Sequence, residues 1–193
     1  MKKSLILSSL LMMSGSALIA ADMGNDWFIG TEVGGMNINL NLKATRGGET
    51  VSVTDAMDTT YEAIKIGKYF DNSRVYGIID YQNVKDSLSS WAVGIGYDYL
   101  IKNSTCWTPF IGVNASYLKA NIDEFPVLNK PAGFTAGIEA GLIYALGKNY
   151  EMELGARYIN TSDFEDSISF TNASAKIKGK TVSQYYLGLN YKF

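Results

Sequence analysis

The chain has 193 residues, which is enough for one domain once a leader is removed. Its 17 basic and 19 acidic residues nearly balance, so the composition gives no reason to expect nucleic acid as a partner. The chain contains no histidine, which removes the commonest general base and the commonest metal ligand. Cys106 is the only cysteine, which excludes an intramolecular disulfide, and we expect it to be a packed small side chain.

Residues 1–21 have the layout of a cleaved secretory signal peptide. A basic start, Met1-Lys2-Lys3, precedes an apolar run, and small residues around Ala20 and Ala21 supply the cleavage site. The apolar run is interrupted by serine and glycine and is shorter than the ~20 residues that a spanning helix needs, so we predict cleavage and not an anchor. The mature chain, residues 22–193, is then expected to form a single domain with nothing after its last strand.

From Trp27 onward the apolar residues recur with a period of two. The clearest case is residues 91–99, where Trp91, Val93 and Ile95 alternate with small residues. Because successive side chains of a strand point to opposite faces, one face there is apolar and the other is small or charged. The pattern predicts eight strands, at residues 27–40, 61–70, 74–83, 91–99, 107–118, 133–146, 151–160 and 182–193.

The predicted connections alternate between short and long. Short links fall at residues 71–73, 102–105 and 147–149. Outer-membrane barrels have short periplasmic turns and longer external loops, so we expect the long links to be extracellular loops and both termini to be periplasmic. The long links are residues 41–60, 84–89, 119–131 and 161–180.

The chemistry of the two faces favours a membrane-spanning barrel over a soluble one. The apolar face is almost free of charge, its exception being Lys68 near a turn, and its aromatic residues gather toward the strand ends, as in interfacial girdles. We therefore predict an all-β, transmembrane, antiparallel up-and-down β-barrel of a Gram-negative cell envelope. The polar face would enclose a structural charge network, for which a gate or proton path is the alternative. Its members are Glu32, Lys65, Arg74, Asp80, Asp98, Glu139, Glu153, Arg157 and Lys192.

The end of the chain carries the most specific pattern. Residues 185–193 alternate apolar side chains up to a terminal phenylalanine, and they resemble the C-terminal signal that the outer-membrane insertion machinery recognises. The residues of this signal are Tyr185, Leu187, Leu189, Tyr191 and Phe193. With Trp27-Phe28-Ile29-Gly30 and Arg157-Tyr158, the mature chain is similar to the small outer-membrane β-barrel family typified by the membrane domain of outer membrane protein A.

This OmpA-like resemblance implies export through a cleaved signal peptide and insertion into the outer membrane, but no single activity. Members of the family act as envelope-stabilising proteins, adhesins, host-defence evasion factors and, occasionally, enzymes. We expect no peptidoglycan-binding domain of the kind that two-domain members have, so cell-wall anchoring is not carried over.

We expect a non-enzymatic protein, with no catalytic residue, cofactor or metal, that has a structural or adhesion-type role through surface-exposed loops. Its expected partners are outer-membrane lipid, the insertion machinery, an unidentified host or cell-surface molecule, and lipopolysaccharide, whose phosphates Lys176, Lys178 and Lys180 could bind. A membrane-embedded enzyme, a small pore and a soluble ligand binder of lipocalin type are the alternatives.

Overall fold

The computed structural model describes residues 26–46, 49–84, 88–122, 132–161, 165–170 and 173–193. The predicted signal peptide, residues 1–21, lies outside these residues. Within them, no helix is long and apolar enough to cross a membrane.

Nine strands make up the described chain, and eight of them form the barrel. Their alternation of apolar with small or polar residues suits a sheet whose two faces meet different surroundings. The strands are β1 (Trp27–Arg46), β2 (Glu49–Tyr69), β3 (Ser73–Val84), β4 (Leu88–Leu100), β5 (Trp107–Ile122), β6 (Ala132–Ala145), β7 (Tyr150–Asn160), β8 (Glu165–Phe170) and β9 (Ala173–Lys192).

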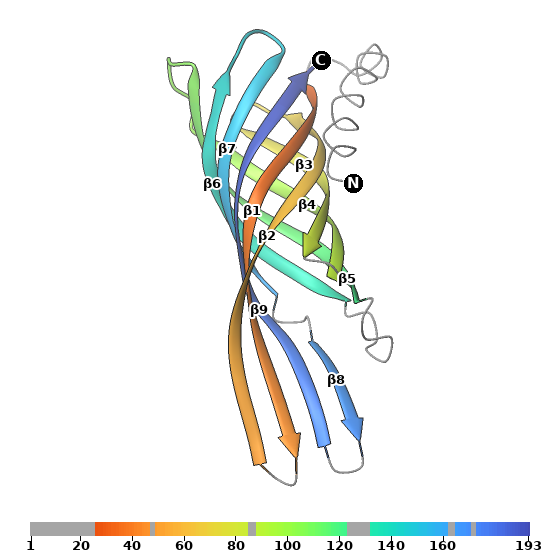
Figure 1. Ribbon diagram of the computed structural model, residues 1–193. Helices are drawn as coiled ribbons and strands as arrows, with labels where there is room; N and C mark the ends of the chain where they lie inside the picture. The colour runs from red at the N-terminus through yellow and green to blue at the C-terminus, as the bar shows by residue number, and fades with distance from the viewer. Residues whose placement is uncertain (1–25, 47–48, 85–87, 123–131, 162–164, 171–172) are drawn as a thin grey trace.

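The barrel is an antiparallel up-and-down sheet that closes on itself (Figure 1). Each strand from β1 to β7 pairs with its neighbour in sequence, β9 pairs with β7, and β1 pairs with β9. Closure leaves these eight strands without an unpaired edge at the level of the barrel, as a sheet in hydrocarbon requires. The predicted eight-stranded up-and-down barrel is confirmed.

The apolar face of the barrel points outward. Ile95 and Ile138 are 66% and 63% exposed, whereas Asp98 and Glu139, on the same two strands, are buried. A soluble barrel of lipocalin type would place these two sets of residues the other way round. The outward face is thus the one that suits hydrocarbon.

Two girdles of aromatic residues flank this apolar belt. Near the chain termini, Trp107 packs on Tyr144 with ring centroids 4.5 Å apart, and Tyr150 packs on Tyr191 at 5.1 Å. Lys68 lies in the same girdle, with its Nζ 5.9 Å from the ring centroid of Trp27. The girdle at the opposite end consists of Tyr81, Trp91, Tyr117, Phe134, Tyr158 and Tyr185.

The strand bounds differ from the prediction at two of the long links. Residues 41–60 and 161–180, which we expected to be loops, are largely strands that extend far beyond the barrel (Figure 1). They form a four-stranded sheet in the order β2-β1-β9-β8, which we call the blade: residues 37–46 of β1, 49–59 of β2, all of β8, and 173–180 of β9. The expectation was wrong because valine and threonine favour strands whether or not one face of the strand meets a membrane.

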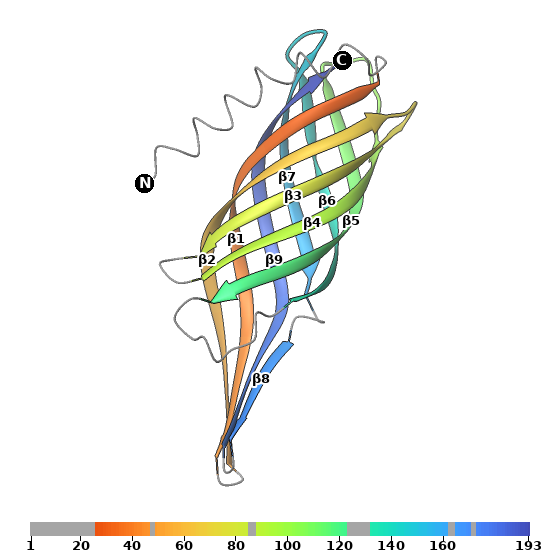
Figure 2. The same cartoon turned by 90° about the vertical axis from the view of Figure 1, so that its right-hand side faces the viewer.

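The start of β1, the end of β9 and the short turns lie at the end of the barrel opposite the blade (Figure 2). The backbone N–H of Phe193 donates to the carbonyl of Trp27 at 3.0 Å, which joins the last strand to the first. Cys106 lies in a turn at this end and is exposed, so the expectation that it is packed was wrong. A turn residue at the barrel rim has few neighbours that could cover it.

Candidate functional site

Seven of the nine predicted charged residues form one buried cluster inside the barrel. Strand alternation places each of them at an inward position. The register sets two ion pairs directly, since Arg74 lies opposite Asp98 and Glu139 lies opposite Arg157 on neighbouring strands. The cluster consists of Glu32, Lys65, Arg74, Asp98, Glu139, Glu153 and Arg157.

Glu153 is the centre of one half of the cluster. Arg74 binds it in a bidentate manner, with Nη1–Oε2 and Nη2–Oε1 distances of 2.8 and 2.9 Å. The Nζ of Lys65 lies 3.0 Å from each carboxylate oxygen, and the Tyr186 hydroxyl and the Asn190 amide each donate at 2.9 Å. Both oxygens thus receive several donors, which offsets the cost of burying the charge.

Arg157 is the centre of the other half. Its Nη1 and Nη2 donate to the two oxygens of Glu32 at 2.6 and 2.8 Å, and its Nε donates to Glu139 at 2.6 Å. The Tyr76 hydroxyl also donates to Glu139. Lys65 connects the two halves, because its Nζ lies 2.7 Å from Glu32 as well as close to Glu153.

Arg74 also joins the network to aromatic rings. Its Nε donates to Asp98 Oδ2 at 2.6 Å, while Asp98 Oδ1 has no hydrogen-bond partner among the described residues. The guanidinium carbon lies 5.0 Å from the ring centroid of Phe110 and 5.6 Å from that of Phe28, where ring faces attract cations.

The other two predicted charges lie outside the cluster. Asp80 accepts a hydrogen bond from Gln82 at 3.0 Å. Lys192 is near the chain termini and pairs with Glu151 at 2.7 Å, and the Tyr69 hydroxyl donates to the same carboxylate at 2.6 Å. Glu151 was not among the predicted residues, although it is two residues before Glu153 and strand alternation assigns it to the same face.

Glycines make room for the tyrosines that complete the network. A Cβ atom on Gly155 would lie 2.4 Å from Cζ of Tyr186, and one on Gly96 would lie 2.2 Å from Cζ of Tyr76. In each case the glycine is the cross-strand partner of the tyrosine. The rings therefore lie flat over bare backbone, and their hydroxyls reach the carboxylates.

Apolar layers cover the ionic cluster on both sides. Toward the termini, Leu100, Phe110 and Ile143 pack together with Tyr69. Toward the blade the layer includes Met36, Tyr61, Ile78 and Val182. Side chains thus occupy the barrel interior at three successive levels, as expected for an eight-stranded barrel.

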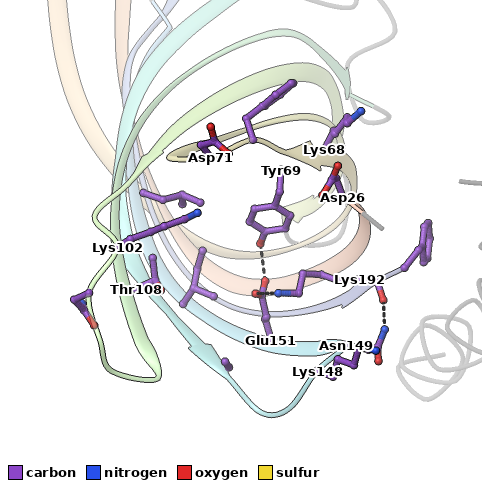
Figure 3. A pocket seen from close by; sticks show the side chains of 16 residues that line it. Asp26, Lys68, Tyr69, Asp71, Lys102, Thr108, Lys148, Asn149, Glu151 and Lys192 are labelled. Atoms are coloured by element: carbon purple, nitrogen blue, oxygen red, sulfur yellow. Dashed lines mark hydrogen bonds and ion pairs between the residues drawn. The ribbon is translucent and has the colours of Figure 1, made fainter. Parts of the chain in front are cut away.

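The end of the barrel near the termini is open and forms a cavity of about 950 Å³ (Figure 3). Its floor includes Tyr69 and Ile143, and the Glu151–Lys192 pair lies on its wall. Lys102 also points into it. The lining carries both signs of charge, and no group of three or more potential metal-ligating side chains occurs within the described residues.

The predicted insertion signal lies on the outward face of β9. Tyr185 and Leu187 are 68% and 48% exposed, and the rings of Tyr191 and Phe193 pack together at 5.6 Å. Leu189 is half-buried on the same face.

The three lysines that we considered for lipopolysaccharide lie in the blade. In β9, Lys176 is the register partner of Lys43 and Lys178 that of Asn41. Lys180 falls at the register shift between Asn39 and Leu40, where β9 has one residue more than β1.

Comparisons with known proteins agree with this architecture. No protein-family model matches the chain, and no curated protein matches its sequence. The crystal structure of Neisserial surface protein A (NspA) is similar with a TM-score of 0.62 at 15% identity, over 86% of this chain and 97% of that one. The outer membrane protein AlkL, solved by solid-state NMR in DMPC lipid bilayers, is similar with a TM-score of 0.56 at 13% identity, over 90% and 93%. The chain thus has the fold of the small outer-membrane β-barrels, and the predicted resemblance is confirmed at the level of the fold.

Proposed function

We propose that the protein is an integral outer-membrane β-barrel that carries out a non-enzymatic, structural or surface-interaction role through the blade and the neighbouring extracellular loops. The observation that carries this proposal is the blade itself, which extends from the end of the barrel opposite the termini. A rigid scaffold that holds an exposed segment away from its body is the usual arrangement for recognition. The interior, packed with ion pairs, would act as structural support.

Orientation in the membrane is the first thing to test, and the native cysteine offers a probe. Cys106 is exposed at the end near the termini, so it should react with a membrane-impermeant maleimide only after the outer membrane is opened. Ser52→Cys in a Cys106→Ser background places the same probe on the blade, where Ser52 is exposed. This variant should react in intact cells. Labelling of Cys106 in intact cells, with no labelling at position 52, would overturn the proposed orientation.

A shortened blade separates a structural role from an interaction role. Asn39 and Ala56 are register partners, so residues 40–55 can be replaced by a two-residue Asn-Gly turn. A strain lacking the gene would be complemented with either form and assayed for detergent resistance and for adhesion to wells coated with extracellular-matrix protein. A structural role predicts that both forms restore detergent resistance, and an interaction role predicts that only the intact form restores adhesion. Failure of the intact form in both assays would contradict the proposal.

The proposed route to the membrane uses both ends of the chain. Residues 1–21 would direct export and be cleaved, and the residues Tyr185, Leu187, Leu189, Tyr191 and Phe193 would be recognised by the insertion machinery. Phe193→Ala should then lower the amount of assembled barrel in cells more than it lowers refolding of the purified protein in detergent. An equal loss in both would indicate a purely structural role for this residue.

Lipopolysaccharide is a proposed partner of the blade. Lys176, Lys178 and Lys180 lie close together in β9, and a group of lysines suits phosphate. Replacement of all three by glutamine should weaken binding of purified lipopolysaccharide. The matched control replaces Lys102 and Lys148, at the opposite end, and should leave binding unchanged.

A small pore or a membrane-embedded enzyme remains the alternative function. The three packed levels of the interior favour a barrel without wide conductance. Stable nanosiemens openings in planar bilayers would support a pore. Turnover of lipid A, phospholipids or peptides by the purified barrel would support an enzyme.

A further inference from the structure

One margin of the blade is a strand with no hydrogen-bonded neighbour on one side within the described part of the chain. Among the residues that the structure describes, β3 pairs with β2 only from Thr60 to Tyr69, and β2 from Glu49 to Asp55 pairs with β1 alone. Figure 1 shows this part of β2 at one margin of the blade and β8 at the other. An edge strand presents a row of backbone N–H and C=O groups that can pair with another chain.

Of the protections that natural edge strands usually carry, this edge has acidic side chains but neither lysine, proline nor a bulge. Lysine, proline, bulges and short length are the usual devices. Residues 49–59 of β2 contain neither lysine nor proline, and their register with β1 runs without a shift. Val51 and Val53 are 63% and 52% exposed beside the edge. The edge is therefore long, regular and partly apolar.

The distribution of charge selects the kind of strand that could pair there. Both marginal strands are acidic, with Glu49, Asp55 and Asp58 on β2 and Glu165 and Asp166 on β8, and no base lies in residues 49–59 or 165–170. The bases of the blade are all on the two inner strands, at Lys43, Arg46, Lys176, Lys178 and Lys180. A second copy that docked edge to edge would bring acid against acid, and like charges on adjacent strands are destabilising.

We propose that the free edge of β2 binds an extended, basic segment of another protein, which adds to the blade as a further strand. Main-chain hydrogen bonds would supply affinity, and alternate side chains would supply specificity. Apolar residues at alternate positions of the segment would pack beside Val51 and Val53. The basic residues between them would lie on the other face, which carries Asp58, and the positive charge of the whole segment would suit an edge strand that is acidic overall. This inference rests on the proposed function, since the blade must lie outside the cell to meet such a partner.

The test uses the purified mature protein in an uncharged detergent without lipopolysaccharide. The probe is a fluorescein-labelled peptide in which lysine and valine alternate, and binding is followed by fluorescence anisotropy at physiological salt. Three comparison peptides are a block arrangement of the same residues, an alternating glutamate–valine peptide, and the alternating lysine peptide with a central proline. We expect each comparison peptide to bind at least about tenfold more weakly.

Two double variants assign the binding to the edge. Val51→Lys with Val53→Lys installs the protection that natural edges carry, and it should weaken binding by about tenfold or more. Asn72→Lys with Leu146→Lys adds the same charge at the opposite end of the barrel and should leave binding unchanged. Equal binding of the block peptide, unaltered binding by the β2 variant, or absence of binding up to about 1 mM peptide would each overturn the inference. Failure of the proposed function would appear separately, as lack of labelling at position 52 in intact cells.

Discussion

The barrel and the blade share continuous strands, but their apolar and polar faces are exchanged. In the barrel, β1 and β2 bury charged residues such as Glu32 and Lys65 on the inner face and expose apolar residues such as Val33 on the outer face. In the blade, the face that continues the outer one is polar, with Asn37 donating to Asp58 at 2.9 Å. Asn41 on the same face donates to Ser52 and Thr54, at 3.3 and 3.2 Å, and Thr45 meets Thr50 at 3.0 Å. The face that continues the barrel interior carries Ile38, Val51, Val53 and Met57.

The two faces exchange at the junction of the barrel and the blade. Register between β1 and β2 is uninterrupted, so no bulge turns the side chains over, and the amino-acid sequence itself exchanges the two faces. The proposed membrane location accounts for this exchange, since outward side chains should be apolar in hydrocarbon and polar in water. One backbone geometry would then serve two solvents, and variants in the barrel and in the blade should respond differently.

The largest expected difference comes from truncating a buried base in the barrel. Arg157→Ala leaves Glu139 without its ion-pair partner and removes two hydrogen bonds from Glu32, so we expect the free energy of unfolding to fall by ~3–5 kcal/mol. Urea titration in detergent micelles, followed by tryptophan fluorescence, measures the loss. Lys43→Ala on the exposed blade is the control and should change stability by less than ~0.5 kcal/mol. Similar losses in both variants would mean that the network does not support the barrel.

The second largest difference is expected between an arginine on the outward face of the barrel and an arginine on the blade. Ile95→Arg places a charge in the middle of the outward row of β4 and should destabilise the protein in a bilayer by ~2–4 kcal/mol. Val53→Arg makes a similar change on the blade, where the side chain is about as exposed, and should cost less than ~0.5 kcal/mol. Equal tolerance of arginine at the two positions, measured by unfolding in lipid vesicles, would show that hydrocarbon does not surround Ile95.

A smaller effect is expected from filling the space under a tyrosine. Gly155→Ala would push against the ring of Tyr186, which is fixed by its hydrogen bond to Glu153, so we expect a loss of ~1–3 kcal/mol. Gly147→Ala is the matched control, because a Cβ there meets no atom within 4 Å. The same urea titration measures both variants. If the two losses were alike, close packing against Tyr186 would not be what requires glycine at position 155.

The smallest effect is expected from shortening the blade. Replacing residues 40–55 by a two-residue turn leaves the barrel pairing from Trp27 to Gly35 intact, so stability should change by less than ~1 kcal/mol. Heat-modified mobility on a gel and the urea midpoint would report it. A barrel that no longer folds would show that the blade contributes to the barrel and is not simply displayed by it.

Strand alternation made much of this molecule predictable. A period of two is a local property of the chain, so it assigned Glu32, Arg74 and Glu153 to one face without knowledge of the fold. The same reasoning failed at residues 41–60, because the apolar and polar faces of the strands are exchanged there and the barrel pattern does not continue. Glu151 was also open to prediction from its face, but its partner Lys192 lies 41 residues away along the chain.

The sequence by itself determined that a two-faced sheet forms, which residues share a face, and that the charges belong together on one of them. Only the tertiary structure decided that Arg157 meets Glu32 across the barrel, that β9 closes on β1, and that β8 joins the blade. The physical reason is the distance along the chain between the residues that interact. Face and turn are set by neighbouring residues, whereas closure and ion-pair choice depend on contacts between residues more than a hundred positions apart, as between Glu32 and Arg157.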